Sequence, residues 1–287
     1  MPSESRVLAC VDQSQYADHV ADYAAWAALR LALPLEFLHI LDRHPERAVE
    51  VDHSGAIGVD AQEKLLQTLA AEDESRSRAA RESGRLFLNQ LRERAIAAGV
   101  PSPDVRQRHG ALEATLVEQE DSVRLFVLGR RGESAETTQR DLGRNLERVV
   151  RALHKPILTV TNDFQVPRRI MIAFDGGNLT RKGVAMLATS PLFSGLPIHL
   201  LMSGKPRKEA PKQLEWAQET LAQAGFEVEA HLLPGDAETT VARKVQELDI
   251  DMLVMGAFTH SPLRRIFFGS RTLDLLRAAS IPVLLLR

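Results

Sequence analysis

Cysteine and aromatic residues are scarce in this chain of 287 residues. The single cysteine, Cys10, excludes an internal disulfide and is typical of a protein kept in a reducing compartment. Because Cys10 lies inside an apolar run, we expect it to act as a small buried hydrophobe. Aromatic residues make up 5% of the chain, which argues against a stacking platform for single-stranded nucleic acid.

Excess charge and long apolar runs are also missing. The formal net charge is −2, and the arginines are spread along the chain, so we expect neither nucleic acid nor an anionic membrane as a partner. No apolar run reaches the length of a membrane span. The first residues, 1–6, lead into an apolar run without the character of a signal peptide, which predicts a cytoplasmic protein.

Several catalytic motifs are absent. The sequence has no G-x-S-x-G elbow for a serine nucleophile and no G-x4-G-K-S/T loop of the P-loop ATPases. The pair Gly176-Gly177 follows a predicted strand but lacks the dinucleotide-binding fingerprint. Because these catalytic motifs are absent, we expect a binding protein rather than an enzyme.

The chain contains two copies of one pattern. The segment 6–12 (RVLACVD) returns as 169–175 (RIMIAFD), and 143–160 returns as 269–286. Asp12 and Asp175 are 163 residues apart, whereas Gly143 and Gly269 are 126 apart, so the first copy carries 37 extra residues. Most of this insertion, 61–98, has the spacing of a helix.

Short apolar runs alternate with helical patterns in both copies. In the second copy we predict strands at 170–174, 198–202, 226–233, 251–255 and 282–286, and helices at 180–188, 212–225, 239–248 and 270–279. Continuous apolar strands that alternate with helices indicate a parallel sheet covered on both faces. We therefore predict an α/β protein with two tandem doubly wound domains of five parallel strands each, at 1–163 and 164–287.

A candidate anion site follows the fourth strand of the second copy. Gly256 comes directly after that strand, and Gly269 and Ser270 begin the next predicted helix. Glycine lets the backbone approach a phosphate, and a helix N-terminus directs unpaired N–H groups toward it. The hydroxyls of Ser261, Ser270 and Thr272 could add hydrogen bonds, and Asp175 at the end of the first strand could accept one from an adenine amino group or a ribose hydroxyl.

These residues resemble the universal stress protein A family in its tandem, two-domain form. The ATP-binding members of that family have G-x2-G-x9-G-S/T after the fourth strand, and this chain has Gly256, Thr259, Gly269 and Ser270 at that spacing. The resemblance covers essentially the whole chain and implies an adenine-nucleotide alpha-hydrolase-like fold.

The resemblance also implies roles for individual residues. Asp175 and the Met202 backbone would face adenine and ribose. The phosphates would be held by Gly256, Gly269, Ser270 and Thr272 with the N–H of Arg271. Thr259 departs from the family's glycine: at positive φ, a β-branched residue costs about 1 kcal/mol or more. Either the loop makes a different turn there, or the Thr259 hydroxyl contacts a phosphate.

The first copy has a degenerate version of this loop. Gly129 and Gly132 are kept, but Gly143 comes one residue late, and Arg144 and Leu146 replace the two hydroxyl residues. Arg130, Arg131 and Arg144 could bind another anion. A solvated basic loop or a domain interface is the alternative that we favour.

Two further features of the first copy have simple explanations. His39, His44 and His53 with Asp42 and Asp52 have the composition of metal ligands but not the spacing of a zinc site, so we expect no metal there. The run of charged residues 72–78 indicates the solvated face of a helix. Because this helix is inserted after the second strand, it could also form a lid over the pocket of the first domain.

The functional expectation is a stress-response protein that binds ATP or a related adenine nucleotide, with or without Mg²⁺, in its second domain. The resemblance implies that the fifth strands, 157–160 and 283–286, join the two domains as a pseudo-dimer, and two chains could assemble further. Two alternatives remain open: a slow Mg²⁺-dependent ATPase, or a nucleotide-free scaffold with another small ligand in its first domain.

Overall fold

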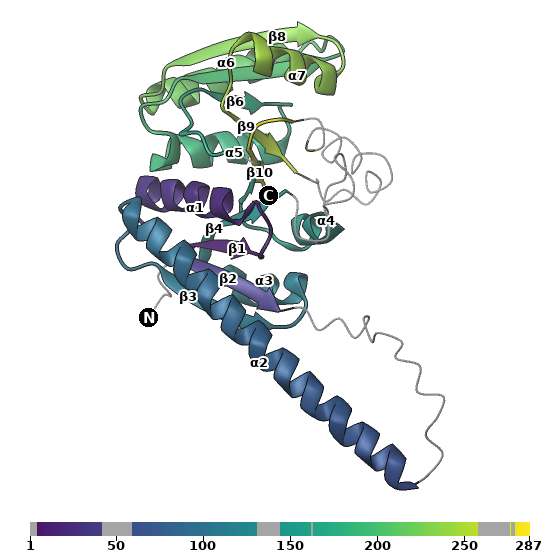
Figure 1. Cartoon of the computed structure of the whole chain (residues 1–287). Helices are drawn as coiled ribbons and strands as arrows, with labels where there is room; N and C mark the ends of the chain where they lie inside the picture. The colour runs from purple at the N-terminus through teal and green to yellow at the C-terminus, as the bar shows by residue number, and fades with distance from the viewer. Residues whose placement is uncertain (1–4, 42–58, 131–143, 162, 258–275, 277–278) are drawn as a thin grey trace.

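The computed structural model describes residues 5–41, 59–130, 144–161, 163–257, 276 and 279–287. In this part of the chain, strands alternate with helices in both halves (Figure 1). The N-terminal half contains β1 (Arg6–Val11), α1 (Ala17–Leu31), β2 (Leu35–Leu41), α2 (Val59–Ala97), β3 (Asp104–His109), α3 (Leu112–Gln119), β4 (Val123–Gly129), α4 (Arg144–Ala152) and β5 (Ile157–Val160). The C-terminal half contains β6 (Ile170–Ala173), α5 (Asn178–Ala188), β7 (Ile198–Gly204), α6 (Ala210–Gln223), β8 (Val228–Pro234), α7 (Ala237–Glu247), β9 (Met252–Gly256) and β10 (Val283–Leu286).

The strands form one continuous sheet of ten. Their order is β3-β2-β1-β4-β5-β10-β9-β6-β7-β8, and every pair is parallel except β5 with β10. The order within one half mirrors the order within the other, so the two domains meet at their fifth strands. The predicted fold class, with two tandem five-stranded doubly wound domains, is confirmed.

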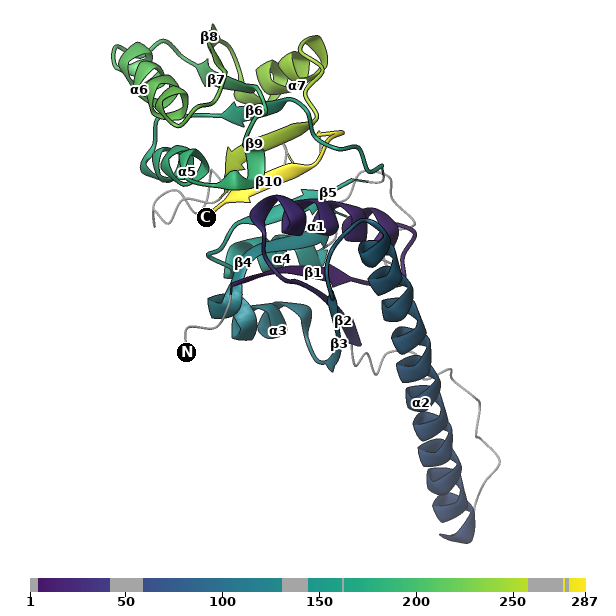
Figure 2. The same cartoon turned by 90° about the vertical axis from the view of Figure 1, so that its left-hand side faces the viewer.

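Helices cover both faces of the sheet and bury two apolar layers. One layer packs beneath α1, α2, α5 and α6, and the other beneath α3, α4 and α7. Both layers run through both halves, because strands such as β6 and β9 are apolar at every position and therefore present buried side chains to each face. Figure 2 shows the helices on either side of the sheet.

The inserted residues form most of α2, which has 39 residues and closely matches the predicted helix at 61–98. Its C-terminal part packs on β2, β3 and α1, where Arg94 forms ion pairs with Asp18 and Asp22 of α1 at 3.1 and 2.6 Å. Its N-terminal part extends well beyond the sheet in both views (Figures 1 and 2). The helix therefore projects from the domain instead of folding back over it as a lid.

The two domains also exchange arginines beside the β5–β10 pair. Arg130, just after β4, donates to the carbonyl oxygens of Ile281 at 2.7 Å and Ala279. Arg287, just after β10, donates to those of Leu153 at 2.7 Å and Arg151 at 3.2 Å. Burial lowers the pKa of Arg287. Arg130 thus belongs to the domain interface, which is one of the three roles that the sequence allows for it.

Among the described residues, none of the helices combines the length and the apolar character that crossing a membrane requires.

Candidate functional site

The carboxyl ends of β6, β7 and β9 form the candidate site of the C-terminal domain. In a doubly wound sheet the ligand crevice opens where neighbouring strands send their connections to opposite faces. Here β6 lies between β7 and β9, and the chain continues from β6 into α5 on one face of the sheet. The residues that follow β6 and β9 therefore border this crevice.

Asp175 lies two residues after β6 and is exposed. Its Oδ1 accepts hydrogen bonds from the Gly177 N–H at 2.8 Å and from the Thr180 hydroxyl at 2.6 Å. Thr180 is buried in the first turn of α5. The carboxylate is therefore fixed in orientation through one oxygen, and Oδ2 remains as an acceptor at the rim of the crevice.

Gly176 makes the turn that places Asp175. Its φ of +77° lies in the left-handed region, where a side chain is strained. A Cβ at this position would also lie 2.0 Å from Oε1 of Gln213 on α6. The turn after β6 therefore requires glycine for its backbone angle, and a side chain there would also displace the Gln213 amide.

Met202 lies near the end of β7, next to β6. Its side chain is 1% exposed and packs in the apolar layer, so only its backbone is available to a ligand. The exposed Arg207, in the loop after β7, donates to the Asp175 carbonyl oxygen at 2.9 Å and lies 4.0 Å from the Met202 sulfur. The Arg207 guanidinium thus bridges the ends of the two strands, a role that the sequence did not suggest.

Gly256 ends β9 against the start of α5. A Cβ there would lie 3.2 Å from Cγ2 of Thr180 and 3.3 Å from Cδ2 of Leu179, which is tighter than ordinary packing allows. Gly256 therefore lets α5 approach the end of β9, and Thr180 in turn holds Asp175. The three predicted residues Asp175, Met202 and Gly256 lie on neighbouring strand ends, as their positions in the repeat predicted.

The other predicted site residues lie outside the described part of the chain. They are Thr259, Ser261, Gly269, Ser270, Arg271 and Thr272. The same holds for Gly132, Arg131 and Gly143 of the first copy, and for the side chain of Arg144. Leu146, in contrast, is buried in the core beneath α4. The role of this loop in phosphate binding thus stays a prediction.

The N-terminal domain fills the equivalent crevice differently. Asp12 corresponds to Asp175 and accepts hydrogen bonds from the N–H and hydroxyl of Ser14. His39 stands where Met202 stands in the second copy, and its Nδ1 lies 3.0 Å from the Val11 carbonyl oxygen. Its ring packs edge-on against Phe87 of α2, with centroids 5.5 Å apart. His39 is therefore engaged inside the fold, and the other residues of the loose His/Asp group lie outside the described residues.

The inserted helix also reaches this crevice. Ser83 of α2 exchanges hydrogen bonds of 3.3 and 3.4 Å with the Gln13 amide, beside Asp12. Gly84 of α2 lies so close to β2 and β3 that a Cβ would meet Gln107 at 2.1 Å and His39 at 3.1 Å. Since α6 begins at Ala210, the counterpart of Gly84, the second domain has no helix segment equivalent to the part of α2 before Gly84.

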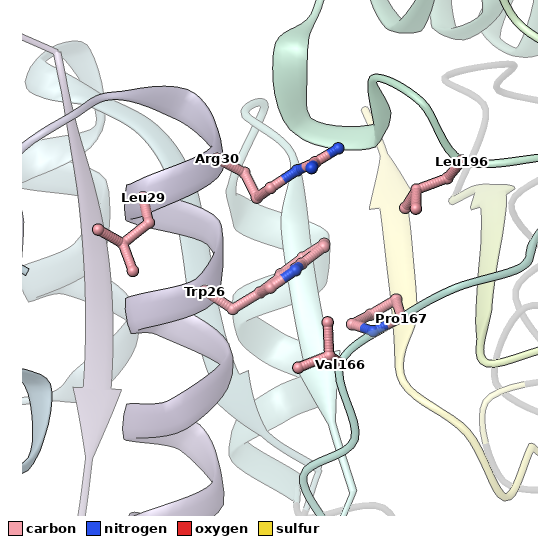
Figure 3. A pocket seen from close by; sticks show the side chains of 6 residues that line it. All are labelled: Trp26, Leu29, Arg30, Val166, Pro167 and Leu196. Atoms are coloured by element: carbon pink, nitrogen blue, oxygen red, sulfur yellow. The ribbon is translucent and has the colours of Figure 1, made fainter. Parts of the chain in front are cut away.

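A separate pocket lies between α1 of the first domain and the segments that lead into β6 and β7 of the second (Figure 3). It has a volume of about 330 Å³ and is lined by Trp26, Leu29, Arg30, Val166, Pro167 and Leu196. Arg30 is the one charged side chain among them, and it donates to the carbonyl oxygens of Leu192 at 3.0 Å and of Ser194. The guanidinium thus ties α1 to the second domain, and the pocket lacks the convergent polar groups that fix a ligand.

The chain thus consists of two doubly wound α/β domains in tandem, each with an aspartate after its first strand. The model of the Universal stress protein family matches residues 5–161 and 190–287. The chain belongs to this family and carries its domain twice, in tandem.

The chain is 35% identical over 284 residues to Universal stress protein Slr1230 of Synechocystis, with 98% of this chain and 99% of that protein covered. A universal stress protein from Archaeoglobus fulgidus has a similar structure, with a TM-score of 0.69, 16% identity, and 98% and 96% of the two chains covered. A putative universal stress protein from Pseudomonas aeruginosa follows with a TM-score of 0.64, 19% identity, and 99% and 94% covered. At 16% and 19% identity, the similarity to these two structures shows a shared fold and nothing about function.

Proposed function

We propose that the C-terminal domain, residues 164–287, binds ATP or a related adenine nucleotide, and that the protein is a nucleotide-dependent regulatory module of the stress response. The observation that carries this proposal is the fixed carboxylate of Asp175 at the switch point of the second domain. Its Oδ1 accepts two hydrogen bonds, at 2.8 and 2.6 Å, which leaves Oδ2 as the acceptor for a ligand. An adenine amino group and a ribose hydroxyl are donors of the kind that this acceptor would bind.

The surroundings of Asp175 suit the flat base and sugar of a nucleotide. Gly256 lets α5 approach the end of β9, and the Met202 side chain points into the core, so neither residue presents a side chain to a ligand. Arg207 spans the ends of β6 and β7, and its planar guanidinium is suited to stacking on a base. We propose Arg207 as a further contact to the nucleotide.

The phosphates would bind beyond Gly256, after the carboxyl end of β9. In this proposal Gly269, Ser270 and Thr272, with the Arg271 N–H, receive them at the start of the next helix, where N–H groups favour an anion. Thr259 and Ser261 would add hydroxyl contacts. Binding would stabilise the loop 256–270 and change the surface offered to a partner protein.

The N-terminal domain, residues 1–163, does not bind the same ligand in this proposal. His39 and Phe87 occupy the region that Met202 and α6 border in the second domain, and Ser83 is hydrogen-bonded beside Asp12. Each chain would therefore take up one nucleotide.

Isothermal titration with ATP on paired variants tests the proposal. Asp175→Asn keeps an acceptor for Thr180 but turns the other side-chain atom into a donor, which faces the adenine donors unfavourably. We expect Asp175→Asn to weaken binding at least tenfold and the matched variant Asp12→Asn to leave it unchanged. Equal effects of the two variants, or no ATP binding by the wild-type protein, would refute the proposal. An ADP assay with Mg²⁺ on the same samples distinguishes binding from turnover.

A further inference from the structure

Three metal-ligating side chains meet on the edge strands of the C-terminal domain, away from the crevice just described. His199 lies on β7, and Glu229 and His231 lie on β8, the edge strand of the sheet. In the parallel register His199 is level with Glu229, and His231 is two residues farther along β8. Because alternate residues of a strand share a face, all three side chains lie on the α7 side of the sheet.

Their donor atoms form a compact triangle. Nδ1 of His199 lies 3.4 Å from Nε2 of His231 and 3.4 Å from Oε2 of Glu229, whereas Nε2 of His231 lies 3.6 Å from the other carboxylate oxygen, Oε1. With one donor atom from each side chain, the three atoms lie within 4.8 Å of one another. Zn²⁺ binds imidazole nitrogen at about 2.0–2.1 Å and carboxylate oxygen at about 2.0–2.2 Å, in tetrahedral geometry. Those bond lengths require donors about 3.3–3.5 Å apart. The two histidine nitrogens match this spacing at 3.4 Å, and a rotation of the exposed Glu229 carboxylate would bring one oxygen to a similar distance from both.

The burial of the three side chains suits an open site. The two histidine side chains are each 13% exposed, whereas the Glu229 side chain is 64% exposed. The imidazoles are held in place by packing, with their rings stacked at a centroid distance of 5.7 Å and an interplanar angle of 19°. The carboxylate closes the triangle from the solvent side, so a water molecule can take the fourth position of a bound ion.

The first domain has ion pairs at the same place. There Glu36 corresponds to His199, Asp104 to Glu229, and Arg106 to His231, by the register of β2 with β3. The Glu36 carboxylate is neutralised by Arg6 at 2.9 Å and Arg106 at 3.2 Å. Arg169, the counterpart of Arg6, instead pairs with Asp249 at 3.4 Å. The second domain has thus exchanged a closed ion-pair cluster for two imidazoles and a carboxylate.

We propose that His199, Glu229 and His231 bind a first-row transition-metal ion, for which Zn²⁺ is the natural occupant. Imidazole and carboxylate ligands suit Zn²⁺ better than Mg²⁺ or Ca²⁺, which prefer sets of oxygen ligands. The ion would link β7 to the edge strand β8. The site is independent of the nucleotide proposal, since it lies on different side chains.

Cobalt titration of the untagged, chelator-treated and nucleotide-free protein tests the site. Co²⁺ replaces Zn²⁺ in tetrahedral sites and gives visible absorption bands that report the geometry. We expect one Co²⁺ per chain, displaced by Zn²⁺. His199→Gln, His231→Gln and Glu229→Gln should each weaken binding about 100-fold or more, because even changes to residues that only support the ligands cost about 10–100-fold.

Matched controls use the same substitutions elsewhere. His109→Gln on β3, the exposed edge strand of the first domain, and Glu215→Gln at an exposed position of α6, on the other face of the sheet, should leave the affinity unchanged. A double variant, His44→Gln with His53→Gln, controls for the other histidines considered from the sequence. The proposal is wrong if the wild-type protein shows no saturable Co²⁺ or Zn²⁺ binding, or if binding survives in both His231→Gln and Glu229→Gln. In that case the two imidazoles share only a hydrogen bond.

A measurement on the wild-type protein covers the case in which a variant fails to fold. Zn²⁺ should protect His199 and His231, but not His109, from modification by diethyl pyrocarbonate, as mapped by mass spectrometry. Equal modification of His199 and His231 with and without Zn²⁺ would overturn the proposal.

Discussion

Leu158 and Leu284 lie opposite each other across the antiparallel pair β5–β10, and they occupy the same position in the two repeats. Each is 1% exposed. On either side, Thr159 pairs with Val283 and Ile157 with Leu285, so each pair joins one position of the repeat to the position two residues away in the other copy. This is the pattern of an isologous dimer interface, here built within one chain.

The first prediction concerns the contact between Leu158 and Leu284. Leu158→Ala and Leu284→Ala should each lower the free energy of unfolding by about 2–5 kcal/mol, since each leaves a cavity in a buried layer. Because the two side chains face each other, the double variant should deviate from additivity by about 0.5–3 kcal/mol. Urea denaturation of the four proteins gives the cycle, and strict additivity would mean that the two leucines do not share one packing site.

The second prediction concerns the arginines that cross the interface. Arg287→Gln should cost about 1.5–3 kcal/mol, because it removes charged donors from carbonyl oxygens of α4 and the residue after it. Arg130→Gln should have a similar effect through Ala279 and Ile281. Arg124→Gln, at an exposed position of β4, is the control and should change the stability little. Chemical denaturation measures all three, and a neutral Arg287→Gln would contradict the account of the interface.

The third prediction concerns Gly183 in the middle of α5. A Cβ there would lie 2.2 Å from Cδ1 of Leu286, a side chain 2% exposed in β10. Gly183→Ala would gain about 1 kcal/mol in helix propensity, but overpacking typically costs about 1–3 kcal/mol, so we expect a net loss of stability. The reverse exchange on the exposed face, Ala185→Gly, should cost about 1 kcal/mol through propensity alone. A stabilised Gly183→Ala protein would show that α5 does not approach β10 so closely.

The fourth prediction concerns Cys10. Burial, with a smaller contribution from the charge of Asp12, raises the pKa of its thiol from 9.0 to about 12. The folded protein should therefore react slowly with iodoacetamide at mildly alkaline pH, whereas the unfolded chain reacts quickly, since the thiolate is the nucleophile. Because the folded state holds the proton more tightly, the stability due to this group is complete below about pH 9 and is lost as the pH rises toward 12.

Removal of the thiol provides the control for that pH dependence. Cys10→Ala should unfold with a weaker dependence on pH above 9 than the wild-type protein. Cys10 is half-buried and packs against the apolar layer, and it is therefore less enclosed than the sequence led us to expect. Rapid alkylation of Cys10 in the folded protein would contradict the assignment of a neutral thiol there.

The repeat made most of the fold predictable. Two copies of one strand-and-helix pattern, with apolar strands such as 170–173, indicate two covered parallel sheets whatever the details of their loops. The inserted helix was also visible, since apolar residues recur at helical spacing through 61–98. Its projection beyond the sheet was not, because that depends on which residues pack against it and not on its periodicity.

The site was predictable only in part. Asp175 and Gly256 follow from the positions of strand ends, which the sequence shows, whereas Met202 was implied by the family resemblance. The hydrogen bond from Thr180 to Asp175 could have been predicted, because Thr180 places a hydroxyl in the first turn of the helix that follows Asp175. The cluster of His199, Glu229 and His231 could not, because it depends on the register between two strands separated by a whole helix. That register is fixed by the packing of both faces.

Calorimetric titration with ATP of the pair Gly269→Val and Gly143→Val tests the central claim, the inequality of the two domains, most directly. We predict that the wild-type protein binds one ATP per chain, that Gly269→Val abolishes the binding without unfolding the protein, and that Gly143→Val hardly changes it. Two ATP molecules per chain, or equal losses in the two variants, would contradict this account.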